Sequence, residues 1–475
     1  MVMERTTVAS ASWCRDEFRG IEFGDPRINR RFFKVAEQLS NQPSQPINQA
    51  CGRWSDSKAA YRLFQNEKME SSAIRRVHAL KTRERAEDYP VVIAATDKSF
   101  FNYEGHEETT GLGHIGSTTK KDSRGLIMQT ALAVTPEGLP LGILDHEIWA
   151  RERNPKRSKK DLRNITIENK ESYHWLESLK RISNLMSGSG TSVVVVADRE
   201  ADIYEFIDRA HTLNAPFVVR AAWDRALVDE DLEGIGQLWS HLNQQKIAGT
   251  IEVDVPARGK KESARVANVS VSFAKVNLRR PKKVRFPVRT EVAVSLSVSA
   301  VWARELRPPK GATPLAWMLL TSVDVTDFES AVERINWYKQ RWSVEIFHKI
   351  MKSGCQVEKC RLQTADRLER YLTLFSVIAW KIHALTHENR HDPKGPCSRI
   401  LQPHEWQSLY CKIHRTDQPP VKPPTIREAV RMIAQLGGFL ARKGDGEPGI
   451  ITIWRGWQRL ADISEDWLLF RRRPT

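Results

Sequence analysis

Four polar side chains in the segment INWYKQRWSVEIFHKIMK have the types and spacing to hold a metal ion beside a phosphate. Arg341, Glu345 and Lys352 follow Tyr338 at offsets of three, seven and fourteen residues. The segment has no Gly or Pro and is predicted to form one long amphipathic helix, on which the four side chains would share roughly a 60° arc. Glu345 could bind a metal while the other three donate to phosphate oxygens. The alternative is a solvated helix face with i,i+4 charge pairs.

Two aspartates strengthen the hypothesis of a metal site. Asp97 and Asp198 end the apolar runs PVVIAATD and SVVVVAD, which are predicted to be buried strands. Open α/β sheets bind ligands beyond the carboxyl ends of their strands. With Glu345, the two aspartates would form a cluster that binds two Mg²⁺ ions, or Mn²⁺ in their place, for chemistry at a phosphodiester. The alternative is a turn or cap, because Asp198 begins DREAD and could cap a helix.

The segments between these acids predict a mixed sheet that would hold them. GLIMQTALAV and LPLGILDHEIW are joined by the turn sequence TPEG and are predicted to form a hairpin. Helices are expected near residues 171–186 and 199–213, and a strand in PFVVRAAW. This order combines an antiparallel hairpin with right-handed parallel crossovers.

The bulk composition points to a polyanionic partner. The formal net charge is +16 and the pI about 9.6, which favours nucleic acid first and an acidic membrane surface second. No apolar run reaches the ~18 residues of a transmembrane helix, and the first residues lack the apolar core of a signal peptide. The six cysteines form no CxxC pair, so free thiols in a reducing cytoplasm are expected.

Basic residues concentrate in two regions. Residues 1–75 are predicted to be helical, with a helix starting at Asp25-Pro26. They form either a small DNA-binding bundle or an ordinary basic cap, and the candidate contacts are Arg27, Arg30 and Arg62. Residues 225–325 show the alternation of antiparallel strands. Between Arg258 and Arg289 this region carries eleven Lys or Arg residues and one acid.

The spacing of Tyr338, Arg341, Glu345 and Lys352 resembles the Tyr-x2-Arg-x3-Glu-x6-Lys signature of the insertion-sequence-four family of bacterial transposases. The resemblance covers most of the chain except residues 1–20 and about 385–425. Its other segments are GDPR (24–27), AYRLFQN (60–66), the strand ending at Asp97, ADREADIYEF (197–206), FVVR (217–220), PPKGATPLAWMLLTS (308–322) and LGGF (436–439).

The resemblance implies an α/β fold with a ribonuclease-H-like mixed-sheet catalytic core and an inserted antiparallel β domain, between helical domains at the two ends. The expected division is a DNA-end-binding domain (1–75), the first part of the core (76–224), the basic insertion (225–325), the second part of the core (326–385) and a C-terminal domain for dimerisation and DNA contacts (386–475).

The resemblance also implies roles for single residues. Asp97, Asp198 and Glu345 would be the catalytic, metal-binding triad. Tyr338 and Arg341 would grip the phosphate of a nucleotide turned out of the duplex.

Further DNA contacts follow from the same resemblance. Lys352 would contact the DNA backbone. Trp317 would stack on the flipped base, unless it is a core residue. Trp342 is a second aromatic candidate, or a packing residue. Arg220 would reach the scissile DNA, unless it pairs with a catalytic acid. The insertion residues Lys282, Lys283 and Arg285 would neutralise phosphates.

The implied activity is cut-and-paste transposition, by a homodimer paired on DNA, in the bacterial cytoplasm at the nucleoid, with no membrane partner. The enzyme would nick transposon ends, excise the element through a hairpin intermediate and join its 3′-hydroxyls to target DNA. A metal-dependent nuclease without strand transfer is one alternative, and a non-catalytic DNA-binding regulator is the other.

Overall fold

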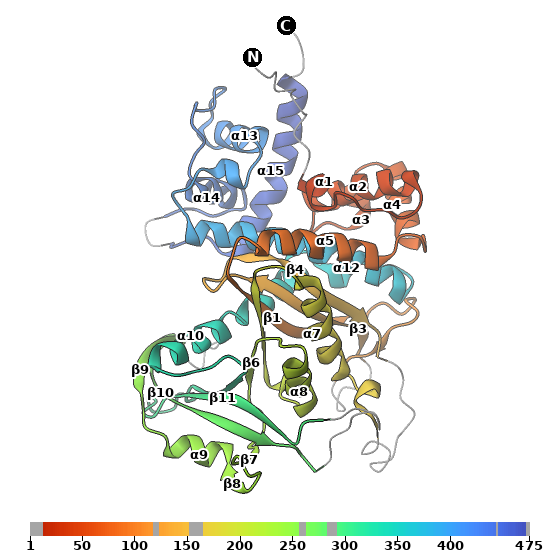
Figure 1. Ribbon diagram of the computed structural model, residues 1–475. Helices are drawn as coiled ribbons and strands as arrows, with labels where there is room; N and C mark the ends of the chain where they lie inside the picture. The colour runs from red at the N-terminus through yellow and green to blue at the C-terminus, as the bar shows by residue number, and fades with distance from the viewer. Residues whose placement is uncertain are drawn as a thin grey trace, which may run out of the picture.

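A 12-stranded mixed sheet forms the centre of the protein (Figure 1). The computed structural model describes residues 13–116, 123–151, 165–255, 263–282, 292–442 and 445–471. The strand order is β2-β3-β1-β5-β6-β12-β11-β10-β7-β8, with β4 on β3 and β9 on β10. The strands are β1 (Val91–Asn102), β2 (Gly113–His114), β3 (Arg124–Val134), β4 (Pro140–Trp149), β5 (Ser192–Ala197), β6 (Phe217–Arg220), β7 (Ala226–Val228), β8 (Gly234–Gln237), β9 (Gly249–Val255), β10 (Arg265–Arg279), β11 (Ser295–Arg304) and β12 (Ala316–Thr321).

The strands β4-β3-β1-β5-β6 form the core that the sequence predicts. β1 pairs with β3 antiparallel and with β5 parallel, and β5 pairs with β6 parallel. The predicted hairpin is confirmed, because β3 and β4 pair antiparallel across TPEG. Gly138 in this turn has φ +99°, and an added Cβ would lie 2.7 Å from the Gln340 side chain, so the turn lies against the segment that carries the signature.

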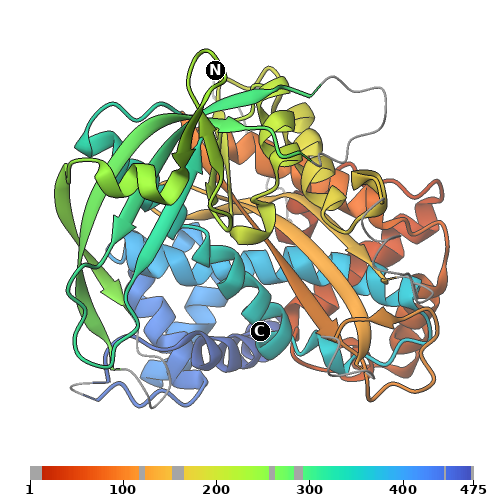
Figure 2. The same cartoon turned by 90° about the horizontal axis from the view of Figure 1, so that it is seen from below.

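The inserted strands are antiparallel, as predicted, and they extend the core sheet. β12 pairs with both β6 and β11, which joins the insertion to the core through continuous backbone hydrogen bonds. Seen from below, the green insertion strands lie on one side and the orange hairpin strands on the other (Figure 2). The insertion is therefore rigidly connected to the strands that carry the aspartates.

Alternate residues of the buried strands contact two different hydrophobic layers. Val92 and Ala94 of β1 contact the layer of α7 (Tyr173–Met186) and α8 (Tyr204–Thr212). Ile93 and Ala95 contact the opposite layer, which contains α10 (Phe328–Lys339), α11 (Trp342–Lys349) and α12 (Ala365–His391). This period of two is the geometry of a strand that is buried on both faces.

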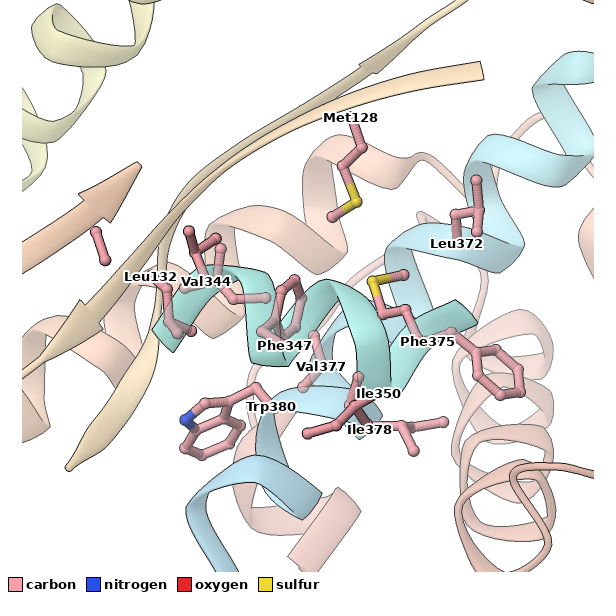
Figure 3. Packing of buried hydrophobic residues seen from close by; sticks show 14 of the residues in the cluster. Met128, Leu132, Val344, Phe347, Ile350, Leu372, Phe375, Val377, Ile378 and Trp380 are labelled. Carbon is pink, nitrogen blue, oxygen red and sulfur yellow. The ribbon is translucent and has the colours of Figure 1, made fainter. Parts of the chain in front are cut away.

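The helix α11 lies between the sheet and α12 (Figure 3). Val344 and Phe347 of α11 belong to one buried cluster with Leu132 of β3 and with Leu372 and Phe375 of α12. All five side chains are buried. This packing fixes the position of α11, and therefore of Glu345, on the sheet.

The predicted single helix over residues 335–352 is wrong in detail. α10 ends at Lys339, α11 runs from Trp342 to Lys349, and a π-helical turn covers Ile350–Gly354. At the break, the Gln340 side chain donates to the Pro136 carbonyl of the β3–β4 turn, 2.9 Å away. A tertiary contact therefore accompanies a break that no Gly or Pro marks in the sequence.

Helices at the two ends of the chain gather above the sheet, with α5 and α12 running side by side beneath them (Figure 1). Asp25 caps α2 as predicted, because its side chain accepts from the Arg27 N–H and Pro26 opens the helix. The N-terminal helices are α1 (Trp13–Glu17), α2 (Pro26–Asn41), α3 (Ile47–Cys51), α4 (Trp54–Gln65) and α5 (Ser71–Ala86). The C-terminal helices are α13 (Pro403–His414), α14 (Ile426–Leu436) and α15 (Ile450–Arg471). The helix α9 (Leu238–Gln244) lies in the insertion.

The structure bears on two expectations from composition. All six cysteines lie in the described part of the chain, where they are buried and form no disulfide. In the part of the chain that the structure describes, no helix is both long and apolar enough to span a membrane.

A buried polar cluster fastens the N-terminal helices to the core. Glu17 of α1 accepts from His78 Nδ1 at 2.6 Å and forms an ion pair with Arg85 at 2.9 Å. The second ring nitrogen, His78 Nε2, accepts from the Ile143 N–H of β4 at 3.0 Å. Because Nε2 is an acceptor, His78 is neutral in the fold, and burial lowers its pKa.

This cluster should make the fold acid-sensitive. Burial alone would raise the pKa of Glu17, but the hydrogen bond from His78 and the Arg85 guanidinium hold it below its usual value of 4.5. The unfolded chain therefore binds protons that the fold excludes, at His78 below about pH 6.5 and at Glu17 below about pH 4.5. The melting temperature of the wild type should fall through both ranges. Glu17→Gln should melt lower at pH 7 and lose less on acidification below pH 4.5. Parallel curves for the two proteins would show that Glu17 is not the acid-sensitive group.

Candidate active site

Asp97 and Asp198 lie next to each other because their strands pair in parallel. The last pair in the β1–β5 register is Thr96 with Ala197, and each aspartate is the next residue. Val196 of β5 packs into the layer that contains α10 and α11, so strand alternation directs Asp198 to that layer, and Asp97 follows Ala95 in the same way. The prediction that Asp97 ends its strand is wrong: β1 continues to Asn102 because β3 pairs with it beyond the end of β5.

Glu345 completes the group from the helix layer. It lies in the first turn of α11, where a carboxylate is favoured by the helix dipole, and it is half-buried. Because Val344 and Phe347 beside it are buried, the helix cannot turn without disrupting the core.

Arg341 and Tyr338 connect the three acids. Arg341 Nη1 lies 3.1 Å from Asp97 Oδ2, and Arg341 Nη2 lies 2.5 Å from Glu345 Oε1. The Tyr338 hydroxyl donates to Asp198 Oδ1 at 3.3 Å. Both Arg341 and Tyr338 are buried, with 9% and 5% of their surface exposed. Residues 244 positions apart are thus in direct contact, so the charged face near residue 340 is not a solvated surface.

The electrostatics of Asp97 reflect this crowding. Burial raises the pKa of its carboxyl to about 6, and Glu345 and Asp198 add to the rise, while Arg341 and the Lys98 N–H oppose it. Asp198 precedes a short 3₁₀ turn but makes no side-chain capping hydrogen bond to it, so the capping alternative is not supported.

The donor set fits a hard divalent cation. Carboxylate oxygens are the ligands that Mg²⁺ and Mn²⁺ prefer, and a cation would relieve both the burial cost of the Asp97 charge and its repulsion by Glu345 and Asp198. Among the described residues, no three His, Cys, Asp or Glu side chains converge closely enough to form a metal cluster in the present arrangement. The Arg341 guanidinium contacts the oxygens of Asp97 and Glu345 instead.

Trp317 and Arg220 lie beside this group. The Trp317 ring meets the Tyr338 ring edge to face, with centroids 5.6 Å apart, and it is half-buried. Arg220, at the end of β6, donates to the Ala316 carbonyl at 3.0 Å, and its charge lies close enough to Tyr338 to oppose the rise in the tyrosine pKa that burial causes. These two side chains, predicted from distant parts of the sequence, therefore flank the same tyrosine.

Lys352 and Trp342 do not join the group. Lys352 lies in the π turn, with its ammonium 5.3 Å from the centre of the Phe101 ring, and burial lowers its pKa. Trp342 is 56% exposed. The expected common helix face therefore holds for Tyr338, Arg341 and Glu345 only, because the helix break and the π turn change the rotation per residue.

Asp202 is a buried acid beside the site, and it is not among the residues predicted from the sequence. Its side chain is fully buried and accepts from the Ala222 and Trp223 N–H groups and from Arg225. It fastens the loop after β6 to the loop after β5, next to Asp198. The second aspartate of ADREAD was the available signal.

The basic candidates lie away from the acids. Arg27 and Arg62 line a surface groove between α2 and α4, and Arg30 is exposed on the same helix as Arg27. Lys282 is exposed, whereas Lys283 and Arg285 lie outside the described residues. The other cations of the groove are Arg31, Lys58 and Lys68.

Three family models match the chain. The Transposase DNA-binding model matches residues 10–69, the Transposase DDE domain model matches residues 168–380, and the Transposase Tn5 dimerisation domain model matches residues 377–472. The second match contains Asp198 and Glu345, and it agrees with the ribonuclease-H-like order of the core strands.

Proposed function

We propose that this chain, which belongs to the Tn5-like insertion-sequence-four family of DDE transposases, excises and reinserts its element through a hairpin intermediate. The protein is a DNA transposase with DNA-binding, catalytic and dimerisation domains. As part of the proposal, two copies paired on DNA each cut one transposon end, at the bacterial nucleoid.

The observation that carries the proposal is the convergence of Asp97, Asp198 and Glu345 around Arg341 and Tyr338. We assign the three carboxylates as ligands of divalent metal, Mg²⁺ first and Mn²⁺ as its substitute. When bound, the metal would activate the attacking oxygen and stabilise the leaving oxygen at phosphorus. The carboxylates themselves hold fixed positions, because β1, β5 and α11 are packed into one core.

Each proposed step is an in-line displacement at a phosphodiester. Water first cleaves one strand and leaves a 3′-hydroxyl on the transposon end. That hydroxyl attacks the opposite strand, forming the hairpin bond and releasing the flanking DNA. Water then opens the hairpin and restores the 3′-hydroxyl. In the last step, this hydroxyl attacks target DNA and releases a target 3′-hydroxyl. One set of carboxylates can serve all four steps in turn.

The neighbouring side chains suit a strand that turns sharply. We assign Tyr338 and Arg341 to the phosphate of a nucleotide turned out of the duplex and Trp317 to stacking on its base, which is worth ~1–3 kcal/mol. Arg220 would contact the scissile strand beside Tyr338. Lys352 and Trp342, which lie outside this group, would contact DNA further along the end.

The basic groove between α2 and α4 is proposed to bind the transposon end. Each lost phosphate contact reduces the salt dependence of binding by about one unit of log–log slope. Arg62→Ala should therefore weaken binding of end DNA and lower this slope by about one. Arg19→Ala removes another exposed cation, which lies outside this groove, and should change neither. The measurement is a fluorescence-anisotropy titration at several salt concentrations, and an unchanged slope for Arg62→Ala would rule out the assignment.

The proposed reaction is tested with purified protein, Mg²⁺ and DNA that carries the element's own ends. Denaturing gels should show hairpin-ended DNA and then joined product. Cleavage without hairpins or joining would favour the metal-dependent nuclease. Binding without cleavage in Mg²⁺ or Mn²⁺ would favour the non-catalytic regulator.

A further inference from the structure

The side chains assigned to DNA phosphate are engaged with the metal-binding acids in this structure. Arg341 forms ion pairs with Asp97 and Glu345, and Tyr338 donates to Asp198. Each of the three acids therefore offers an oxygen to one of two residues of the signature. A phosphate and the carboxylates compete for the same donors.

We propose that Arg341 is an internal counter-cation that keeps divalent metal out of the site until DNA arrives. The proposal rests on the proposed function, because it takes the three acids as metal ligands. In the protein without DNA, the guanidinium holds an oxygen of Asp97 and of Glu345. A phosphate of the transposon end then attracts Arg341 and Tyr338, and the released carboxylates become available to metal.

The charges in the site explain why DNA must bind before the metal does. Three carboxylates lie together, and Arg341 is the cation that pairs directly with two of them. A second cation at the same oxygens would have to approach a buried guanidinium, which costs free energy in a site with little water. Phosphate is a strong partner for a guanidinium because it can accept two parallel hydrogen bonds, so the transfer of Arg341 replaces the contacts that it loses.

The backbone allows Arg341 to move without unfolding a helix. It lies in the break between α10 and α11, where its N–H donates to the Tyr338 carbonyl at 3.1 Å. The Arg341 guanidinium also lies 5.9 Å from the centre of the Tyr338 ring. The two donors are thus adjacent and can turn together toward one phosphate, while buried packing holds α11 and Glu345 in place.

Linkage makes the proposal measurable. If DNA raises metal affinity by releasing the acids, metal must raise DNA affinity by the same factor, and such couplings are commonly about 5–150-fold. The enzyme would then carry little bound metal while it is free of DNA.

The experiment measures Mn²⁺ binding to the full chain by electron paramagnetic resonance, with no catalysis involved. Arg341→Ala without DNA should bind Mn²⁺ about 5-fold tighter than the wild type, or more. End DNA should tighten Mn²⁺ binding in the wild type and have a smaller effect in Arg341→Ala. Adding Asp97→Asn to Arg341→Ala should remove the gain, which would place the ion at these acids.

A matched control separates this exchange from a general change of charge. Lys339→Ala removes a cation two residues away that hydrogen-bonds Asn336, and it should leave Mn²⁺ affinity unchanged. Arg341→Lys keeps the charge but loses the fork that contacts two acids, so it should bind Mn²⁺ with intermediate affinity and serves if Arg341→Ala folds poorly. Equal Mn²⁺ affinity for wild type, Arg341→Ala and Arg341→Lys without DNA would overturn the proposal. Loss of the proposed function would instead appear as absent cleavage of end DNA, whatever the Mn²⁺ affinity.

Discussion

Asp97→Asn should abolish DNA cleavage in Mg²⁺ and leave binding to the transposon end intact when that binding is measured without divalent metal. The substitution keeps the shape of the side chain but removes the charge that a divalent cation needs, and the metal supplies several kcal/mol of transition-state stabilisation. The expected loss in the rate of first-strand nicking is therefore on the order of 10³-fold or more. Binding should persist because the basic groove lies on α2 and α4, away from β1.

The matched control is Glu200→Gln. Glu200 follows Asp198 by two residues and pairs with Lys98 at 3.3 Å, with 62% of its side chain exposed. Its charge is near the site, but it contacts none of the three acids, so nicking should remain close to the wild-type rate. Single-turnover nicking on denaturing gels measures both variants. Cleavage by Asp97→Asn at the rate of Glu200→Gln would refute the assignment of Asp97.

Asp202→Ala should produce the largest loss of stability among these variants. The carboxylate is fully buried and accepts hydrogen bonds from two backbone N–H groups and from Arg225, which is itself 8% exposed. Removing it leaves a buried guanidinium without its counter-charge, which typically costs ~3–5 kcal/mol. The loops after β5 and β6 would also separate, so Asp198 and Arg220 would lose their relative positions.

Urea unfolding followed by tryptophan fluorescence measures this effect. The comparison is Asp324→Ala, because Asp324 also pairs with a cation, Lys275, but both side chains are well exposed. Exposed ion pairs contribute little to the free energy of unfolding, so this control should shift the urea midpoint only slightly. Replacing Asp202 by Ala and Arg225 by Met together should recover part of the loss. A midpoint for Asp202→Ala equal to that of Asp324→Ala would show that the buried pair does not hold the loops.

The strand pattern predicted much of the core. The β-branched run of β5 and the hairpin around TPEG are local signals, and both are confirmed. The end of β1 was misjudged because KSFFN after Asp97 continues the strand only through its pairing with β3. β3 lies some thirty residues further along the chain. The length of the apolar run that ends at Asp97 therefore does not predict this pairing.

The helix that carries Glu345 shows the limit of spacing arguments. Spacing alone relates Arg341 to Glu345, one turn apart, and they are in contact. The contact from Arg341 to Asp97 depends on how α11 packs against β1, and the break at Gln340 coincides with its contact to the β3–β4 turn. Lys352 does not lie on the predicted helix face, because the π turn has more residues per turn than an α-helix.

The central claim is that these carboxylates bind the metal of the cleavage reaction, and a change of ligand tests it most directly. Asp198→Cys offers a soft thiolate, which suits Mg²⁺ poorly and is better tolerated by Mn²⁺. Nicking of end DNA by this variant should be absent in Mg²⁺ and measurable in Mn²⁺, whereas the wild type should nick in both. Nicking by Asp198→Cys in Mg²⁺ at the wild-type rate would contradict the claim, because the position would then need no carboxylate ligand.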